Sequence, residues 1–85
     1  MSDLKQQFEQ AAVDVQQLPE KPDNNILLKL YSLFKQGNLG DVTGEKPGLG
    51  DFKGAAKYNA WSQLKGLSQE KAMEDYIALV VSLKG

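Results

Sequence analysis

Apolar residues recur every three or four positions over most of this chain, a spacing that is typical of amphipathic helices. Polar residues, glycines and prolines interrupt the pattern at three places. The pattern predicts four helices, which we expect to span residues 3–18, 24–36, 52–64 and 69 to the C-terminus. An all-α fold follows from it.

Residues that commonly begin or end helices stand at these boundaries. Asp23 and Ser68 can each accept a hydrogen bond from the first turn of the helix that follows. Proline cannot continue a helix interior, so residues 19–22, which hold two prolines, are expected to form a connector. Gly37 and Asn38 tolerate a left-handed backbone, and we expect the second helix to end there.

The segment 37–50 holds five glycines and a Pro-Gly pair and lacks helical periodicity. We expect a long loop, which Leu39, Val42 and Leu49 could attach to the bundle. Loops of this length in compact domains are often either functional or disordered. The glycines do not form a nucleotide P-loop, because no Gly-Lys-Ser/Thr sequence and no preceding strand are present.

The second predicted helix carries two stripes of side chains. The residues of the first, all aliphatic and suited to a core, are Ile26, Leu30 and Leu33. The neighbouring stripe changes from aliphatic to phenol to ammonium, through Leu27, Tyr31 and Lys35. This gradient suits an amphipathic ligand. Alternatively, other helices cover the wide apolar surface on two sides, and the lysine extends its ammonium group to the rim.

Composition limits the classes of function. The 85 residues suit a single domain, 1–85, and the absence of cysteine excludes disulfides and thiolate metal sites. The net charge is −1, but residues 29–65 carry +3, which favours an anionic partner weakly. A duplex-binding surface normally needs arginines and a clearly basic domain, so we expect no nucleic acid. The polar start and the short apolar runs predict a cytoplasmic protein with no membrane span.

The third predicted helix places Lys53 and Lys57 one turn apart, with Trp61 on the adjacent turn. This pair is either a solvated face or a site for a multivalent anion. Catalysis is not expected, because the chain has no histidine and no cysteine, which are the commonest general base and the strongest nucleophile. Tyr76 and Lys57 could exchange protons, but hydrogen bonding is the role we expect of the tyrosine.

Seven sequence segments, spread over nearly the whole chain, match one known family in register. They are Tyr31-Ser32-Leu33-Phe34-Lys35-Gln36, Gly40-Asp41, Pro47-Gly48-Leu49-Gly50-Asp51-Phe52, Ala56-Lys57-Tyr58-Asn59-Ala60-Trp61, Lys65-Gly66-Leu67-Ser68, Ala72-Met73 and Tyr76-Ile77. In these positions the chain resembles the acyl-CoA-binding proteins. The resemblance implies a four-helix bundle in up-down-down-up order that binds long-chain fatty acyl-CoA esters.

The resemblance also implies roles for particular residues. Tyr31, Lys35 and Lys57 would hold the 3′-phosphate of the CoA adenosine, and Lys53 and Tyr76 would complete the contacts. The acyl chain would meet Leu27, and Phe34 would offer a stacking face near the adenine.

Several positions depart from the family pattern, and one of them is Gly37-Asn38, which replaces a common Ala-Thr. Phe34 lacks the hydroxyl of a tyrosine found in many members, Tyr58 replaces a common tryptophan, and Gln16 replaces a lysine. A contribution from Gln16 to ligand binding is therefore open.

The expected function is non-catalytic binding, transport and buffering of medium- to long-chain acyl-CoA, with this ester as the ligand and without a cofactor or metal. The alternative hypothesis is a helical interaction module whose apolar groove receives a partner helix. We expect a monomer, with transient contacts to acyl-CoA-using enzymes or membranes.

Overall fold

The computed structural model describes residues 3–44, 48 and 50–84. It contains four helices, α1 (Asp3–Val15), α2 (Asn24–Leu39), α3 (Phe52–Ser62) and α4 (Gln69–Lys84). No strand occurs in these described ranges. The predicted all-α fold is confirmed.

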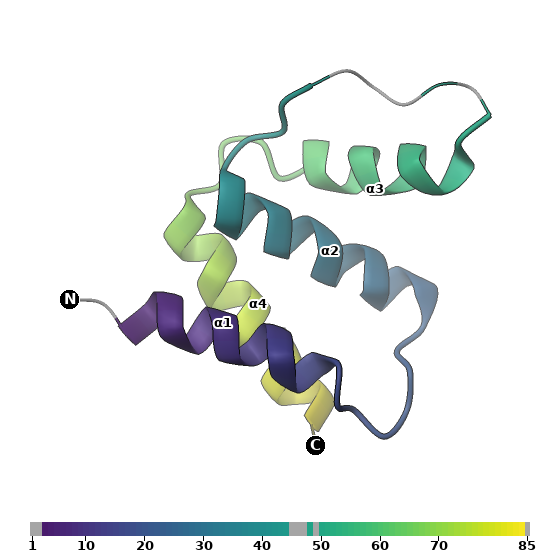
Figure 1. The fold of residues 1–85 in the computed structure, drawn as a ribbon. Helices are drawn as coiled ribbons and strands as arrows, with labels where there is room; N and C mark the ends of the chain where they lie inside the picture. The colour runs from purple at the N-terminus through teal and green to yellow at the C-terminus, as the bar shows by residue number, and fades with distance from the viewer. Residues whose placement is uncertain (1–2, 45–47, 49, 85) are drawn as a thin grey trace.

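Helix α2 lies at the centre of the arrangement. It packs against α4 and against α3, while α1 packs across α4. Figure 1 shows α2 and α3 running in the same direction and α1 running the opposite way. The result is a flat bundle with extents of 37 × 32 × 15 Å. One side of α2 therefore faces the core, and another faces α3.

The core forms where α1, α2 and α4 meet. Its buried side chains come from the predicted apolar stripes and are Phe8, Ala11, Leu30, Leu33, Ala72, Tyr76 and Val80. An aromatic cluster lies at its centre, because the Phe8 ring is 5.4 Å from Phe34 and 5.2 Å from Tyr76 between centroids. Such pairs add about 0.5–1.5 kcal/mol each to the effect of burial.

The second helix does not end where the sequence suggests. Gly37 and Asn38 are helical, and α2 continues to Leu39, so the prediction for this end is wrong. Gly37 instead allows a close crossing, because a Cβ atom there would lie 3.1 Å from both the Phe8 ring and the Met73 side chain. Gly40 ends the helix with a φ of 87°, a conformation that favours glycine.

The other helix ends are close to those predicted. Helix α1 ends at Val15 rather than residue 18, and α3 ends at Ser62 rather than residue 64, because each final turn tightens into short-range hydrogen bonds. The expected caps are present: Asp23 Oδ1 accepts from the N–H of Ile26 at 2.9 Å, and Ser68 Oγ accepts from that of Lys71 at 3.1 Å.

Polar contacts, rather than the expected leucines, attach the start of the long connection. Leu39 is 58% exposed, so its predicted anchoring role is wrong; Val42 is half-buried, and Pro47 and Leu49 lie outside the described residues. Asp41 Oδ1 accepts hydrogen bonds from Gln36 Nε2 and from the N–H of Gly66, both at 2.9 Å.

These contacts join the end of α2 to the turn before α4. They also lower the pKa of the Asp41 carboxyl from its usual value, the bond from the Gly66 backbone having the larger effect.

Candidate functional site

A groove of about 480 Å³ runs between α2 and α3. Helix α2 contributes four side chains from one face, α3 contributes four from its first two turns, and the α1–α2 connector contributes one. They are Asn24, Leu27, Leu28 and Tyr31, then Phe52, Lys53, Ala56 and Lys57, and finally Lys21. Aliphatic side chains therefore stand beside ammonium groups in one open site.

The ammonium groups of two predicted residues lie over the ring of a third. The Nζ atom of Lys57 is 5.3 Å from the centroid of the Tyr31 ring, and that of Lys35 is 5.7 Å from the same centroid. A cation at this distance is attracted to the face of an aromatic ring. Lys35 is half-buried, because its Nζ atom also lies 5.8 Å from the Trp61 ring.

A hydrogen bond to the end of α2 fixes the Trp61 side chain. Its indole Nε1–H donates a 2.9 Å hydrogen bond to the carbonyl of Gly40, and the side chain is buried. The bond ties α3 to the end of α2, so the position of the Lys35 ammonium group depends on how these two helices pack. Trp61 therefore influences the groove indirectly, because the Lys35 ammonium group lies against its ring.

Helices α2 and α3 begin at the same end of the pair (Figure 1), and Phe52 is the first residue of α3. Asp51 Oδ1 caps α3 by accepting a 2.9 Å hydrogen bond from the N–H of Gly54, and Asp23 caps α2 in the same way. Helix N-termini carry a partial positive charge of about half a unit, which is smaller than the full negative charge of each capping carboxylate. Lys21, Lys53 and Lys57 therefore provide the full positive charges beside the aliphatic part of the groove.

Five of the seven predicted site residues are brought together: Leu27, Tyr31, Lys53 and Lys57 line the groove, and Lys35 lies on the Tyr31 ring. Tyr76 does not join them. It is 3% exposed and packs in the core against Phe8 and Phe34, and burial raises the pKa of its phenol. Its contact with a ligand stays a prediction.

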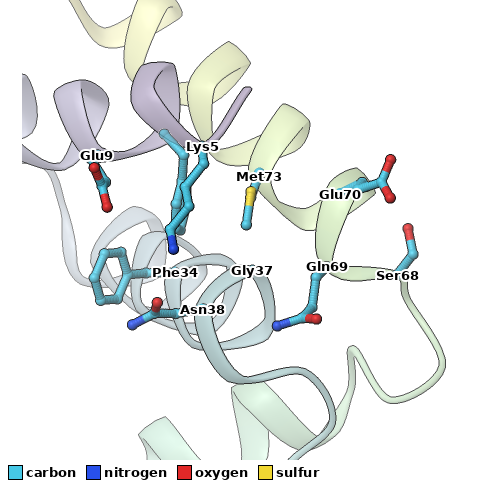
Figure 2. A pocket seen from close by; sticks show the side chains of 10 residues that line it. Lys5, Glu9, Phe34, Gly37, Asn38, Ser68, Gln69, Glu70 and Met73 are labelled. Atoms are coloured by element: carbon cyan, nitrogen blue, oxygen red, sulfur yellow. The ribbon is translucent and has the colours of Figure 1, made fainter. Parts of the chain in front are cut away.

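Phe34 borders a different pocket, of about 650 Å³, between α1, α2 and α4. Figure 2 shows Lys5, Asn38, Gln69 and Met73 around this pocket, with the Phe34 ring on its α2 side. The predicted stacking of Phe34 near an adenine is therefore not explained by the groove and stays a prediction.

The structure adds residues that the sequence reasoning missed. Asn24 and Leu28 continue the Leu27–Tyr31 face by helical spacing, so the pattern could have included them. Phe52, beside Lys53, is an exposed aromatic at the first position of α3. The sequence does not predict that Lys21 lines the groove, because helical periodicity does not determine the path of a connector.

Gln16, whose contribution was left open, borders a neighbouring hollow of about 370 Å³. Lys21 and Leu27 line both this hollow and the groove. The two spaces therefore meet at these two side chains, and the aliphatic surface of the groove continues toward the connector.

Neither a metal cluster nor a membrane-spanning helix occurs in the described part of the chain. No three His, Cys, Asp or Glu residues there lie close enough to hold a metal ion. Among the same residues, no helix has the length and hydrophobicity needed to cross a membrane.

Fold and site together define a small all-α protein with an open apolar groove bordered by ammonium groups. The family model described as Acyl CoA binding protein matches residues 5–80. The chain therefore belongs to the acyl-CoA-binding protein family.

Individual relatives resemble most of the chain. Acyl-CoA-binding protein homolog 1 of Caenorhabditis elegans is 51% identical over 76 residues, which cover 89% of this chain and 88% of the relative. The acyl-CoA-binding protein of Saccharomyces cerevisiae is 49% identical over 80 residues, covering 94% and 92%. The crystal structure of acyl-CoA-binding protein 2 from Oryza sativa superimposes with a TM-score of 0.89 at 40% identity, covering 94% of this chain and 89% of that one.

Proposed function

We propose that this chain binds medium- to long-chain fatty acyl-CoA esters in the groove between α2 and α3, and that it buffers and transports them. One observation carries the proposal: an aliphatic surface at Leu27 and Leu28 stands beside Tyr31, over whose ring the ammonium groups of Lys35 and Lys57 lie. An acyl-CoA has the same two parts, a hydrocarbon tail and a nucleotide with phosphates. The names of the relatives support the same ligand.

The acyl chain should supply most of the affinity. Each buried methylene contributes about 0.8 kcal/mol, whereas a partly exposed contact between lysine and phosphate contributes about 0.2–1 kcal/mol. About a dozen methylenes, if fully buried, would give roughly 10 kcal/mol before the cost of ordering the ligand is subtracted. The tail therefore determines the affinity, and the lysines select a nucleotide-bearing ester over a fatty acid.

Calorimetric titration with free CoA, octanoyl-CoA and palmitoyl-CoA tests the proposal. Affinity should rise steeply with chain length, and free CoA should bind far more weakly than either ester. Equal affinities for free CoA and palmitoyl-CoA would show that the aliphatic surface does not receive the tail. Failure of palmitoyl-CoA to bind at all would overturn the proposal itself.

We also propose that binding occurs without catalysis. The chain has no histidine or cysteine, no carboxylate is among the described residues of the groove, and the Tyr76 hydroxyl belongs to a side chain buried in the core. Incubation with palmitoyl-CoA should release no CoA thiol above the rate in buffer. A cytoplasmic location and a monomeric state stay predictions, which cell fractionation and analytical ultracentrifugation would check.

A further inference from the structure

The end of α2 lies beside the turn between α3 and α4 (Figure 1), and the carboxylate of Asp41 joins the two. A single oxygen, Asp41 Oδ1, accepts both hydrogen bonds, one from Gln36 Nε2 in α2 and one from the N–H of Gly66 in the turn. Gln36 is fully buried, and its Nε2 group donates its second hydrogen to the Leu67 carbonyl at 2.8 Å. The backbone at residues 40–41 is therefore fixed against two parts of the fold.

The residue before Asp41 holds the tryptophan that lies against Lys35. The Gly40 carbonyl accepts the hydrogen bond from the indole of Trp61, and the Lys35 ammonium nitrogen lies 5.8 Å from the centroid of the Trp61 ring. Gly40 has a φ of 87°, so its carbonyl points in a direction that the backbone of other residues rarely allows. Only the Gly40 peptide and the indole ring separate the Asp41 junction from the Lys35 ammonium group.

We propose that Asp41 is a positioning residue for phosphate recognition, which acts through Gly40 and Trp61 to fix the Lys35 ammonium group where a ligand phosphate meets it. Asp41 itself is not among the described residues that line the groove. A long side chain loses rotamer freedom when it binds a ligand, and a fixed aromatic face removes part of that cost beforehand. The proposal rests on the proposed function, because it takes the ligand of Lys35 to be the 3′-phosphate.

Two other roles for this carboxylate predict different results. Its negative charge could act on the site through space, as it does on nearby Lys65, or its hydrogen bonds could serve the stability of the fold alone. Asp41→Asn separates charge from geometry, because the amide oxygen can accept the same two hydrogen bonds while the charge is removed. Asp41→Ala removes the acceptor as well.

Asp14→Ala is the matched control. The Asp14 carboxylate also accepts two hydrogen bonds, from the side chains of Gln10 and Lys84, and it joins α1 to the last turn of α4. Gly66 precedes the first turn of α4, so roughly the length of that helix, about 24 Å, separates the two junctions. The control therefore removes a similar polar contact without changing the end of α2.

Calorimetric titration with palmitoyl-CoA and with its 3′-dephospho analogue tests the proposal. Asp41→Ala should lower the affinity for palmitoyl-CoA roughly three- to tenfold, which is part of the effect of losing one contact between lysine and phosphate, and should lower the affinity for the analogue less. Asp41→Asn should keep most of the affinity, and Asp14→Ala should bind like the wild type. Combined with Lys35→Met, Asp41→Ala should weaken binding no further, whereas its effect should add to that of Lys57→Met.

Trp61 is the only tryptophan of the chain, so its fluorescence reports on its surroundings without any ligand. In the ligand-free protein, Asp41→Ala should shift the emission to longer wavelength, because the buried indole is then held less firmly and meets water. Asp41→Asn and Asp14→Ala should leave the emission unchanged, and circular dichroism shows whether each variant is folded. If Asp41→Ala does not fold, Gly40→Ala tests the same link, since its Cβ atom has room at 3.9 Å from the Gln69 side chain but strains the backbone.

Three results would overturn this proposal while leaving the proposed function intact. They are an unchanged Trp61 emission in folded Asp41→Ala, equal losses of affinity for the two ligands, which would show a structural role alone, and equal losses in Asp41→Asn and Asp41→Ala, which would show that the charge acts instead. Failure of palmitoyl-CoA to bind the wild type would overturn the proposed function and, with it, the assignment to phosphate recognition. The emission of the ligand-free variants would still show whether Asp41 holds Trp61.

Discussion

Two ammonium groups approach the same tyrosine ring, and replacing either tests how the site recognises phosphate. Lys57 Nζ and Lys35 Nζ lie 5.3 and 5.7 Å from the Tyr31 centroid, so the two nitrogens are no more than about 11 Å apart, the sum of these distances. At that limit their repulsion in water is about 0.4 kcal/mol before screening by salt. At such a separation, the empty protein would hold both charges at little cost.

A phosphate in contact with both ammonium groups would gain much more. At about 4 Å, a pair of opposite unit charges gains about 1 kcal/mol in water and about 4 kcal/mol where the effective dielectric constant is near 20. The site is open to solvent, so we expect each contact between lysine and phosphate to contribute about 1–2 kcal/mol. Lys57→Met should then weaken palmitoyl-CoA binding about 5- to 30-fold. Lys35→Met should cost more, because Lys35 is half-buried between two rings whereas Lys57 is exposed.

Titration calorimetry with palmitoyl-CoA and with its 3′-dephospho analogue measures this effect. Each variant should lose less affinity for the 3′-dephospho analogue than for palmitoyl-CoA. The wild type cannot make the contact between lysine and 3′-phosphate with the analogue either. Lys29→Met is the matched control, since Lys29 borders a different hollow near Asp75. The reasoning fails if Lys57→Met binds no more weakly than this control, or if the loss is the same with both ligands.

Three further predictions concern the groove and the junction behind it. Ala56→Leu should fill part of the groove that Ala56 lines and lower the affinity for palmitoyl-CoA roughly tenfold, the value of about two methylenes, while free CoA binds unchanged in the same calorimetric series. Gln36→Met removes the buried donor to Asp41 and to the Leu67 carbonyl, and should lower the free energy of unfolding by about 1–3 kcal/mol in urea titrations. Because the pKa of Asp41 is lowered in the folded state, its stabilisation is present above the usual aspartate pKa of 3.8 and is lost as pH falls through the lower pKa of the folded state. Asp41→Asn should therefore unfold at lower urea than the wild type at pH 7, and the gap should close below that range; an unchanged gap would rule out this linkage.

The helices and the core could be predicted from the sequence because they depend on local spacing. Leu30 and Leu33 repeat at helical intervals and are buried as expected. The end of α2 could not be predicted in the same way. Gly37 is a residue that often ends helices, and only its contact with Phe8 from α1 shows that it serves close packing instead. The contact with α1, rather than the residue type, therefore determines that Gly37 packs within the helix instead of ending it.

The site was predictable where it depends on helix faces. Tyr31 and Lys35 were identified on one stripe of α2, and Lys53 and Lys57 on one face of α3, and the structure brings these faces together. Lys21 could not be found, because the path of its connector depends on how α1 and α2 pack.

Of the two interpretations of the wide apolar surface on α2, coverage by other helices is partly confirmed, and contact with a ligand stays a prediction. Helices do cover α2 on two sides, α4 over the core stripe and α3 over the other. Lys35, however, does not simply extend to solvent, because it is half-buried against the rings of Tyr31 and Trp61. The groove remains open beside α3 because that helix presents Ala56, a small side chain, toward Leu27 and Leu28. A packed helix pair thus leaves an apolar groove open where one of its residues is small.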